Sequence, residues 1–189
     1  MSFATAVNKL TVPEFLALPE SEDRMELVDG EIIIGPRPGK EHQRMLLHLG
    51  HIFLGRTGNQ GEWIADKEMI VQTPEGAEGV RCPDIAYVQE SRQHIAEDDA
   101  VTAGADIAIE IISPGTSEVD RITKRNEYRS SGVSEYWVVD MDERAIIIHY
   151  FAWDRYEYLE GDAAFESLVL KDLGLPCEFT AAGVFGILD

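Results

Sequence analysis

The chain has 189 residues, of which 44% are hydrophobic and 27% are charged, a composition typical of one folded domain and not of a disordered tail or a fibre. We therefore expect residues 1–189 to form a single domain. Acidic residues outnumber basic residues 35 to 16 and give a formal net charge of -19, which disfavours a protein that coats nucleic acid with its whole surface. A small basic or metal-lined cleft remains compatible with this charge.

Cysteine usage and hydropathy indicate the compartment. Cys82 and Cys177 are far apart in sequence and form no C-x-x-C motif, so neither a disulfide framework nor a zinc ribbon is indicated. Residues 1–10 lack the apolar run of a signal peptide, and no apolar stretch approaches the ~20 residues that a membrane span needs. The sequence therefore predicts a cytoplasmic protein without a membrane anchor.

The N-terminal part predicts a helix, a hairpin and a second helix. Thr11 and Glu14 form a T-x-x-E capping box that begins a short helix. The runs 25–28 and 31–34 flank Asp29-Gly30, the dipeptide that most favours a type I′ hairpin turn. From His42 onward, apolar residues recur at intervals of three and four up to residue 55 or 58, which indicates an amphipathic helix.

The rest of the chain predicts mainly strands. Apolar runs indicate strands at 69–71, 84–88, 107–112, 135–139 and 145–150, then a tyrosine-rich segment to about 159 and one more edge strand around 165–170. Residues 117–131 read as a helix that Gly132 closes. This order favours an α/β or α+β fold with a mixed central sheet flanked by helices.

Glu110 is the most informative residue, because it interrupts an otherwise apolar strand. An unpaired buried carboxylate is unfavourable by several kcal/mol, so such a residue usually has a cation, a metal ion or a proton beside it. The simpler alternative is that Glu110 lies on a solvent-exposed face of the strand. Asp84, directly after Pro83, taken alone reads as a turn or cap residue. As a pair on neighbouring strands, the two acids are hard oxygen ligands suited to Mg²⁺ or Mn²⁺.

A third set of polar residues lies on the helix that follows the Glu110 strand. Asp120, Lys124 and Tyr128 are four residues apart and therefore share one helix face. Asp120 and Lys124 are compatible with an ordinary surface ion pair, which contributes a few tenths of a kcal/mol. Alternatively this face turns toward the carboxylates, where Lys124 would stabilise an anionic transition state or position water.

These residues lie in longer blocks that resemble the Uma family, which is classed with the restriction endonucleases of the PD-(D/E)-x-K nuclease superfamily. The resemblance implies a restriction-endonuclease-like fold, Mg²⁺- or Mn²⁺-dependent chemistry on DNA, and a homodimer. The blocks follow the family order over nearly the whole chain: Glu26 to Glu31, Arg81 to Asp84, Ile109 to Pro114, and Asp120, Lys124, Tyr128, Gly132-Val133 and Glu135 to Asp140.

Carried over residue by residue, the resemblance implies that Asp84 and Glu110 are the catalytic metal ligands. In a metal-dependent nuclease the backbone carbonyl of Ile111 would bind the ion with them. Glu26 would be the acid contributed by the N-terminal part of the fold. The chain departs from the family pattern at Ile112, which stands where the strand lysine is expected. The resemblance then implies that Lys124 supplies the ammonium group from the following helix.

His42 is a further candidate, because it begins a helix that also carries His48 and His51, although helix-surface histidines are usually without a special role.

Two functions from different classes stay open. The first is a metal-dependent endonuclease that hydrolyses DNA phosphodiester bonds. The second is a catalytically silent nuclease-fold module that acts through protein contacts or dimerisation, which the missing strand lysine and the acidic surface favour.

Overall fold

The computed structural model describes residues 9–19, 21, 23–112 and 118–188, and for residues 118–121 it describes the backbone only. The helices are α1 (Val12–Leu16), α2 (Lys40–Thr57), α3 (Glu118–Ser130), α4 (Leu168–Asp172) and α5 (Ala181–Phe185), with the short 3-10 helices η1 (Glu90–Ile95), η2 (Phe151–Trp153) and η3 (Gly186–Leu188). The strands are β1 (Met25–Val28), β2 (Glu31–Ile34), β3 (Glu62–Ala65), β4 (Met69–Gln72), β5 (Glu78–Arg81), β6 (Ile85–Val88), β7 (Ile107–Ile112), β8 (Glu135–Asp140), β9 (Ala145–Tyr150), β10 (Arg155–Glu160), β11 (Ala164–Glu166) and β12 (Glu178–Thr180).

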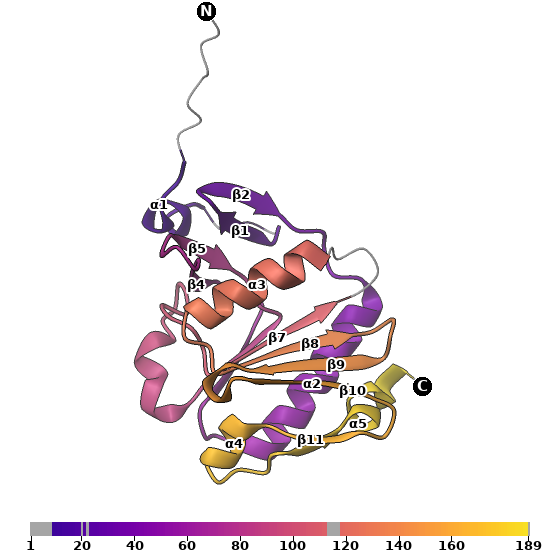
Figure 1. Ribbon diagram of the computed structural model, residues 1–189. Coiled ribbons are helices and arrows are strands. Elements are labelled where there is room, and N and C mark those ends of the chain that lie inside the picture. Colours follow the sequence, from indigo (N-terminus) through magenta and orange to yellow (C-terminus); the bar gives the residue numbers. More distant parts are fainter. Residues whose placement is uncertain (1–8, 20, 22, 113–117, 189) are drawn as a thin grey trace, which may run out of the picture.

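A six-stranded mixed sheet forms the centre of the molecule, with the strand order β10-β9-β8-β7-β6-β3. β7 and β8 are parallel and are joined through α3, whereas the other neighbouring strands of this sheet are antiparallel. A second, four-stranded sheet has the order β2-β1-β5-β4, and α3 lies between the two sheets (Figure 1). The predicted mixed sheet flanked by helices is confirmed.

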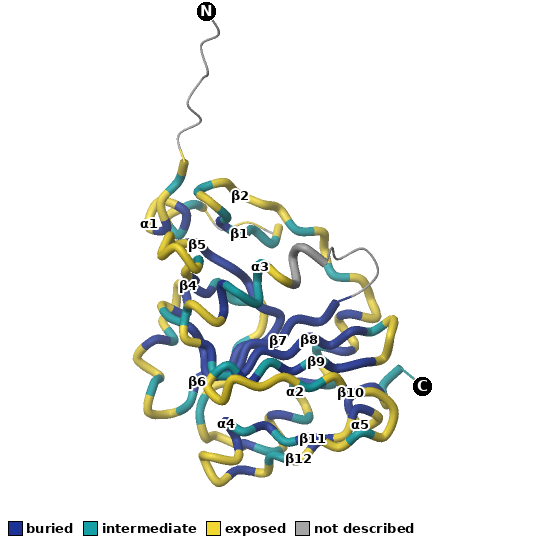
Figure 2. The backbone as a smooth tube through the Cα atoms, in the orientation of Figure 1, coloured by how far each residue is buried: buried dark blue, intermediate teal, exposed yellow. Residues whose placement is uncertain are grey.

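Alternation along β7 decides which face each of its residues occupies. Odd-numbered residues such as Ile109 pack with α2, α5 and the small β11–β12 sheet in one core. Even-numbered Ala108 and Ile112 pack on the opposite face with Tyr128 of α3. Glu110 shares their parity, so the strand places its carboxylate on the α3 face. Both β7 and β8 are buried along their whole length (Figure 2).

The N-terminal elements form as the sequence predicts. The side chains of Thr11 and Glu14 complete both hydrogen bonds of the capping box at the start of α1. Asp29 and Gly30 both have positive φ angles, 50° and 77°, as a type I′ turn between β1 and β2 requires.

Within the described ranges, no helix is long and apolar enough to cross a membrane.

The strand predicted around residues 165–170 is wrong in its second half. β11 ends at Glu166, and α4 begins directly after Ser167, whose hydroxyl accepts a hydrogen bond from the N–H of Leu170. The carboxylate of Glu135 on β8 also accepts a hydrogen bond of 2.7 Å from the N–H of Val169. A side chain distant in sequence therefore helps to fix this helix start, and the local apolar pattern contains no sign of it.

Candidate active site

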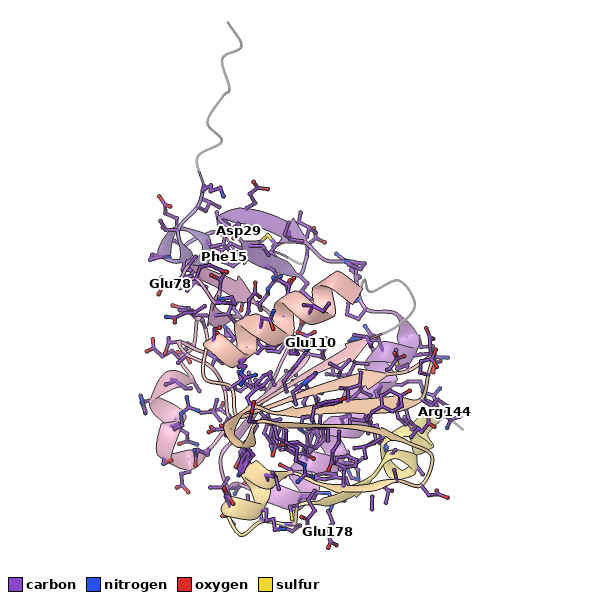
Figure 3. The ribbon with its side chains drawn as sticks, viewed as in Figure 1. Phe15, Asp29, Glu78, Glu110, Arg144 and Glu178 are labelled. Atoms are coloured by element: carbon purple, nitrogen blue, oxygen red, sulfur yellow. The ribbon has the colours of Figure 1, made fainter. Side chains whose placement is uncertain are left out.

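Asp84 and Glu110 lie on neighbouring strands of the central sheet. β6 and β7 pair antiparallel with Ile85 opposite Ile109, so one further step of the register brings Asp84, just before β6, opposite Glu110. Residues of equal parity on paired strands share a sheet face, and both side chains are therefore on the α3 side. Figure 3 shows Glu110 beneath α3, where the two sheets approach each other.

Asp84 is 3% exposed and has partners from several elements. Its Oδ2 accepts a hydrogen bond of 2.6 Å from the N–H of Ile111 and lies 3.2 Å from Nε2 of His42 on α2. Its Oδ1 lies 2.7 Å from Nη1 of Arg24. Burial raises the pKa of Asp84, but the hydrogen bond from His42 and the charge of Arg24 outweigh burial and hold that pKa below its usual value.

Glu110 is 5% exposed, and α3 supplies two of its partners. Tyr128 donates a hydrogen bond of 2.6 Å to Oε1 of Glu110, and Nζ of Lys124 lies 3.1 Å from the same oxygen. Burial raises the pKa of Glu110, the nearby Asp84 charge adds to that rise, and the Lys124 charge only partly offsets them. Two acids in one site thus have pKa values displaced in opposite directions, a pattern typical of functional sites.

Lys124 is shared between two acids from different sheets. Its Nζ lies 3.1 Å from Oε1 of Glu110 on β7 and 3.1 Å from Oε1 of Glu26 on β1. Burial lowers the pKa of Lys124, but the charges of these two carboxylates outweigh burial and raise it, so the side chain stays an ammonium group. The structure thus places a lysine beside Glu110 from the helix, although the strand carries Ile112.

The ion-pair network continues away from Lys124 through Glu26. Oε2 of Glu26 lies 2.9 Å from Nη1 of Arg81, and Arg81 also donates hydrogen bonds of 2.6 Å and 2.9 Å to the two carboxylate oxygens of Glu127. Burial raises the pKa of Glu26, but Lys124 and Arg81 together outweigh burial and lower it. This bidentate pairing ties α3 to β5 and fixes the helix face that carries Lys124.

Sequence reasoning selected none of Arg24, Arg81 and Glu127 as site residues, and of these Arg24 is the one that contacts Asp84. Its Nη1 lies 2.7 Å from Oδ1 of Asp84, its Nη2 lies 3.8 Å from Oε2 of Glu110, and Nη2 also donates to the carbonyl of Cys82. A signal was present, because Arg24 is two positions before Glu26 in an extended segment and so shares its face. The isolated positive charge before a hairpin strand gave no reason to select it.

The side chains of His42 and Tyr128 both lie at the site, beside Asp84 and Glu110 respectively. His42 is buried and faces Asp84, so it is not an ordinary surface histidine of α2, while its Nδ1 has no hydrogen-bond partner among the described residues. Tyr128 is fully buried against Glu110. The side chain of Asp120, and with it the predicted pairing with Lys124, lies outside the described residues.

The donor set fits a hard divalent cation by its chemistry. Asp84, Glu110 and Glu26 supply carboxylate oxygens, which Mg²⁺ and Mn²⁺ prefer. Continuing the β6–β7 register sets Ile111 opposite Pro83, which has no N–H, so the Ile111 carbonyl accepts no ladder hydrogen bond from it. As the side chains stand, no group of three or more His, Cys, Asp or Glu residues in the described ranges is arranged to hold a metal ion.

Together these observations define a protein class. The mixed sheet flanked by helices is restriction-endonuclease-like in fold, and it carries an aspartate and a glutamate on adjacent strands with a lysine of α3 beside the glutamate. The chain belongs to the Uma2 family, whose model matches residues 12–178 and is described as "Putative restriction endonuclease".

A solved structure has the same fold. It is titled a putative nuclease belonging to DUF820 from Anabaena variabilis ATCC 29413, and it superimposes with a TM-score of 0.78 over 95% of this chain and 99% of that chain. The two sequences are 21% identical, so this likeness concerns the fold. No curated protein matches the chain.

Proposed function

We propose that this protein is a Mg²⁺- or Mn²⁺-dependent endonuclease that hydrolyses phosphodiester bonds of DNA. The observation that carries the proposal is the position of Lys124, whose Nζ lies 3.1 Å from Glu110 although the strand itself has no lysine. With Asp84 on the adjacent strand, this supplies the acid, acid and ammonium set that metal-assisted phosphodiester cleavage needs.

Each residue has a role in this proposal that follows from its chemistry. Asp84, Glu110 and the Ile111 carbonyl would hold the metal ion, and Glu26 supplies a further acid from the small sheet. A bound divalent ion would activate water and neutralise charge on the phosphate. Lys124 would stabilise the anionic transition state or orient the attacking water. His42 holds the Asp84 carboxylate by a hydrogen bond and so positions it.

A basic pocket beside α3 supports DNA as the substrate despite the net charge of -19. This arginine pocket has a volume of about 410 Å³ and is lined by Arg125, Arg129, His149, Tyr150, Phe151, Asp154, Arg155 and Tyr156. Arg125 directly follows Lys124 on the helix, so the pocket and the acids lie on adjacent faces of α3. Arginine and aromatic side chains together suit phosphate groups and bases.

The test of this function is turnover of DNA by the purified protein with Mg²⁺ or Mn²⁺. Glu110→Gln should abolish cleavage, because the amide keeps the shape of the side chain but is a poor ligand for a hard cation. Glu135→Gln is the matched control, since Glu135 is also a buried strand glutamate but accepts its hydrogen bonds from Trp137, Ser167 and Val169, away from Asp84 and Glu110. Equal cleavage by wild type and Glu110→Gln would refute the proposal.

A second candidate is the catalytically silent module, and two observations favour it. Arg24 already forms ion pairs with Asp84 and Glu110, and the edge strand β2 exposes Ile32, Ile33 and Ile34. An exposed apolar edge strand is a surface on which a second copy can pair. Absence of turnover with every divalent ion, together with a dimer that Ile33→Lys dissociates, would favour this candidate.

A further inference from the structure

We infer that the Arg24 guanidinium occupies the cation position between Asp84 and Glu110, and that divalent metal binding requires this side chain to swing out toward Asp66. The inference rests on the proposed function, because it deepens the description of the same site. It makes Arg24 a residue that determines how tightly the site holds a metal ion.

Arg24 and a metal ion would compete for the same space. Nη1 of Arg24 lies 2.7 Å from Oδ1 of Asp84, and Nη2 lies 3.8 Å from Oε2 of Glu110. An Mg²⁺ ion needs oxygens at about 2.0–2.1 Å, so an ion bound to both carboxylates would overlap the guanidinium that now separates them. This also explains why the acids as placed form no metal-binding group within the described ranges.

Charge balance in the buried network also favours exchange over addition. At pH values above the pKa of His42, where that side chain is neutral, the cluster contains the carboxylates of Glu26, Asp84, Glu110 and Glu127 and the cations Arg24, Arg81 and Lys124. A divalent ion in place of Arg24 brings the cationic charge to that of the four carboxylates, whereas an ion added beside Arg24 leaves an excess of positive charge. Uncompensated buried charge is strongly unfavourable, so exchange is preferred to addition.

Once displaced, the Arg24 side chain could move toward Asp66. Nε of Arg24 already lies 3.6 Å from Oδ1 of Asp66, a residue whose side chain is 57% exposed. On this side Arg24 borders a cavity of about 280 Å³ to which Asp23, Asp66, Glu68 and Asp98 also contribute. A modest rotation of the Arg24 side chain would therefore move its guanidinium from two buried carboxylates to the more hydrated acidic residues that line this cavity.

The consequence is a site with two states, one closed by Arg24 and one open to metal. A ligand that binds only the open state has an apparent affinity reduced by the fraction of molecules in that state. If Arg24 closes about nine molecules in ten, removing its charge and length should tighten metal binding about tenfold. Asp66 acts in the opposite sense, because it stabilises the open position.

The experiment measures Mn²⁺ binding by isothermal titration calorimetry for the full chain and its variants. Arg24→Gln should bind Mn²⁺ about tenfold more tightly than wild type, and Asp66→Asn should bind it more weakly. In the double variant, which combines Arg24→Gln and Asp66→Asn, the effect of Asp66→Asn on Mn²⁺ affinity should vanish, because the guanidinium that Asp66 would bind is absent. Arg81→Gln is the control for a general loss of positive charge, since Arg81 contacts Glu26 and Glu127 in place of Asp84 and Glu110.

A measurement on the wild type makes the test independent of whether Arg24→Gln folds. The guanidinium Nε–Hε signal of Arg24, assigned by its loss in Arg24→Lys, should shift on titration with Mg²⁺ and stay unmoved in Glu110→Gln. Tight metal binding with an unmoved Arg24 signal, or equal Mn²⁺ affinity in wild type and Arg24→Gln, would overturn the inference and leave the proposed function intact. Absence of specific binding in every variant would overturn both.

Discussion

Nζ of Lys124 on α3 lies 3.1 Å from Oε1 of Glu110 on β7, so the helix supplies the cation that the strand lacks. The two residues are brought together because the even-numbered side chains of β7 face α3, and because Arg81 and Glu127 fix the helix against the small sheet. This pairing lowers the free-energy cost of burying several acids together, because a shared cation offsets their mutual repulsion.

Divalent metal should stabilise the folded protein through Glu110. An ion that binds only the folded state stabilises it by about 2.7 kcal/mol at a hundredfold excess over its dissociation constant. Thermal midpoints measured across an Mn²⁺ titration should therefore rise for wild type and for the control Glu135→Gln, and should rise much less for Glu110→Gln. An equal rise in all three proteins would indicate diffuse binding to the acidic surface.

Lys124→Met should destabilise the fold by about 3 kcal/mol, the magnitude expected when one partner is removed from a buried ion pair. Without the ammonium group, the folded-state pKa of Glu110, which burial already raises, rises further, and the pKa of Glu26 is lowered less because only Arg81 still offsets its burial. The folded variant then binds more protons than folded wild type, so its stability relative to wild type falls as pH rises through those pKa values. Urea unfolding should thus show that Lys124→Met loses more unfolding free energy, relative to wild type, at pH 8 than at pH 5.

The control for Lys124 is Lys171→Met, because Lys171 pairs with Glu166 on the exposed surface. That variant should unfold at nearly the wild-type urea concentration at both pH values. A pH-independent loss in Lys124→Met would mean that the lysine contributes by packing of its aliphatic chain and not by its charge.

His42 should make stability depend on pH near neutrality. Burial lowers the pKa of His42, but the hydrogen bond and charge of Asp84 outweigh burial and raise the pKa above 6.5. Because the folded-state pKa is the higher one, this stabilisation is fully present below pH 6.5 and is lost as pH rises through the folded-state pKa. His42→Gln should flatten the profile of unfolding free energy above pH 6.5. His48→Gln, on the same helix, should leave the slope as in wild type.

The arginine pocket should contribute to DNA affinity without affecting metal binding. Arg125→Gln with Arg129→Gln should weaken binding of duplex DNA and reduce the slope of log affinity against log salt by about one for each phosphate that the variant no longer neutralises. The Mn²⁺ affinity should stay at the wild-type value, since neither arginine has a contact with Glu26, Asp84 or Glu110 in the described part of the chain, and Arg129 pairs with Asp154. Arg56→Gln, whose guanidinium lies over Phe179, is the control. An unchanged salt slope would exclude this pocket as the DNA surface.

The sequence alone predicted most strands of the central sheet and selected its two acids as candidates, whereas β3, β5, β12, α4 and α5 have no counterpart among the predicted elements. Apolar runs with turn residues between them predict β1, β2, β6, β7, β8 and β9, and an acid within an apolar strand selected Glu110 before any contact was known. Such features are local, because alternation, capping and turn chemistry act over a few residues. The helix face shared by Lys124 and Tyr128 follows from the same local geometry.

The tertiary structure decided which charges meet and what they do to one another. Arg24 is 60 residues from Asp84 in sequence, and only the packing of the hairpin against the central sheet brings them to 2.7 Å. The helical start of α4 likewise depends on Glu135, a contact from a distant strand. Charge pairing and burial depend on residues far apart along the chain, so no local pattern contains them. For that reason the acids could be predicted from the sequence, whereas the cation that occupies their site could not.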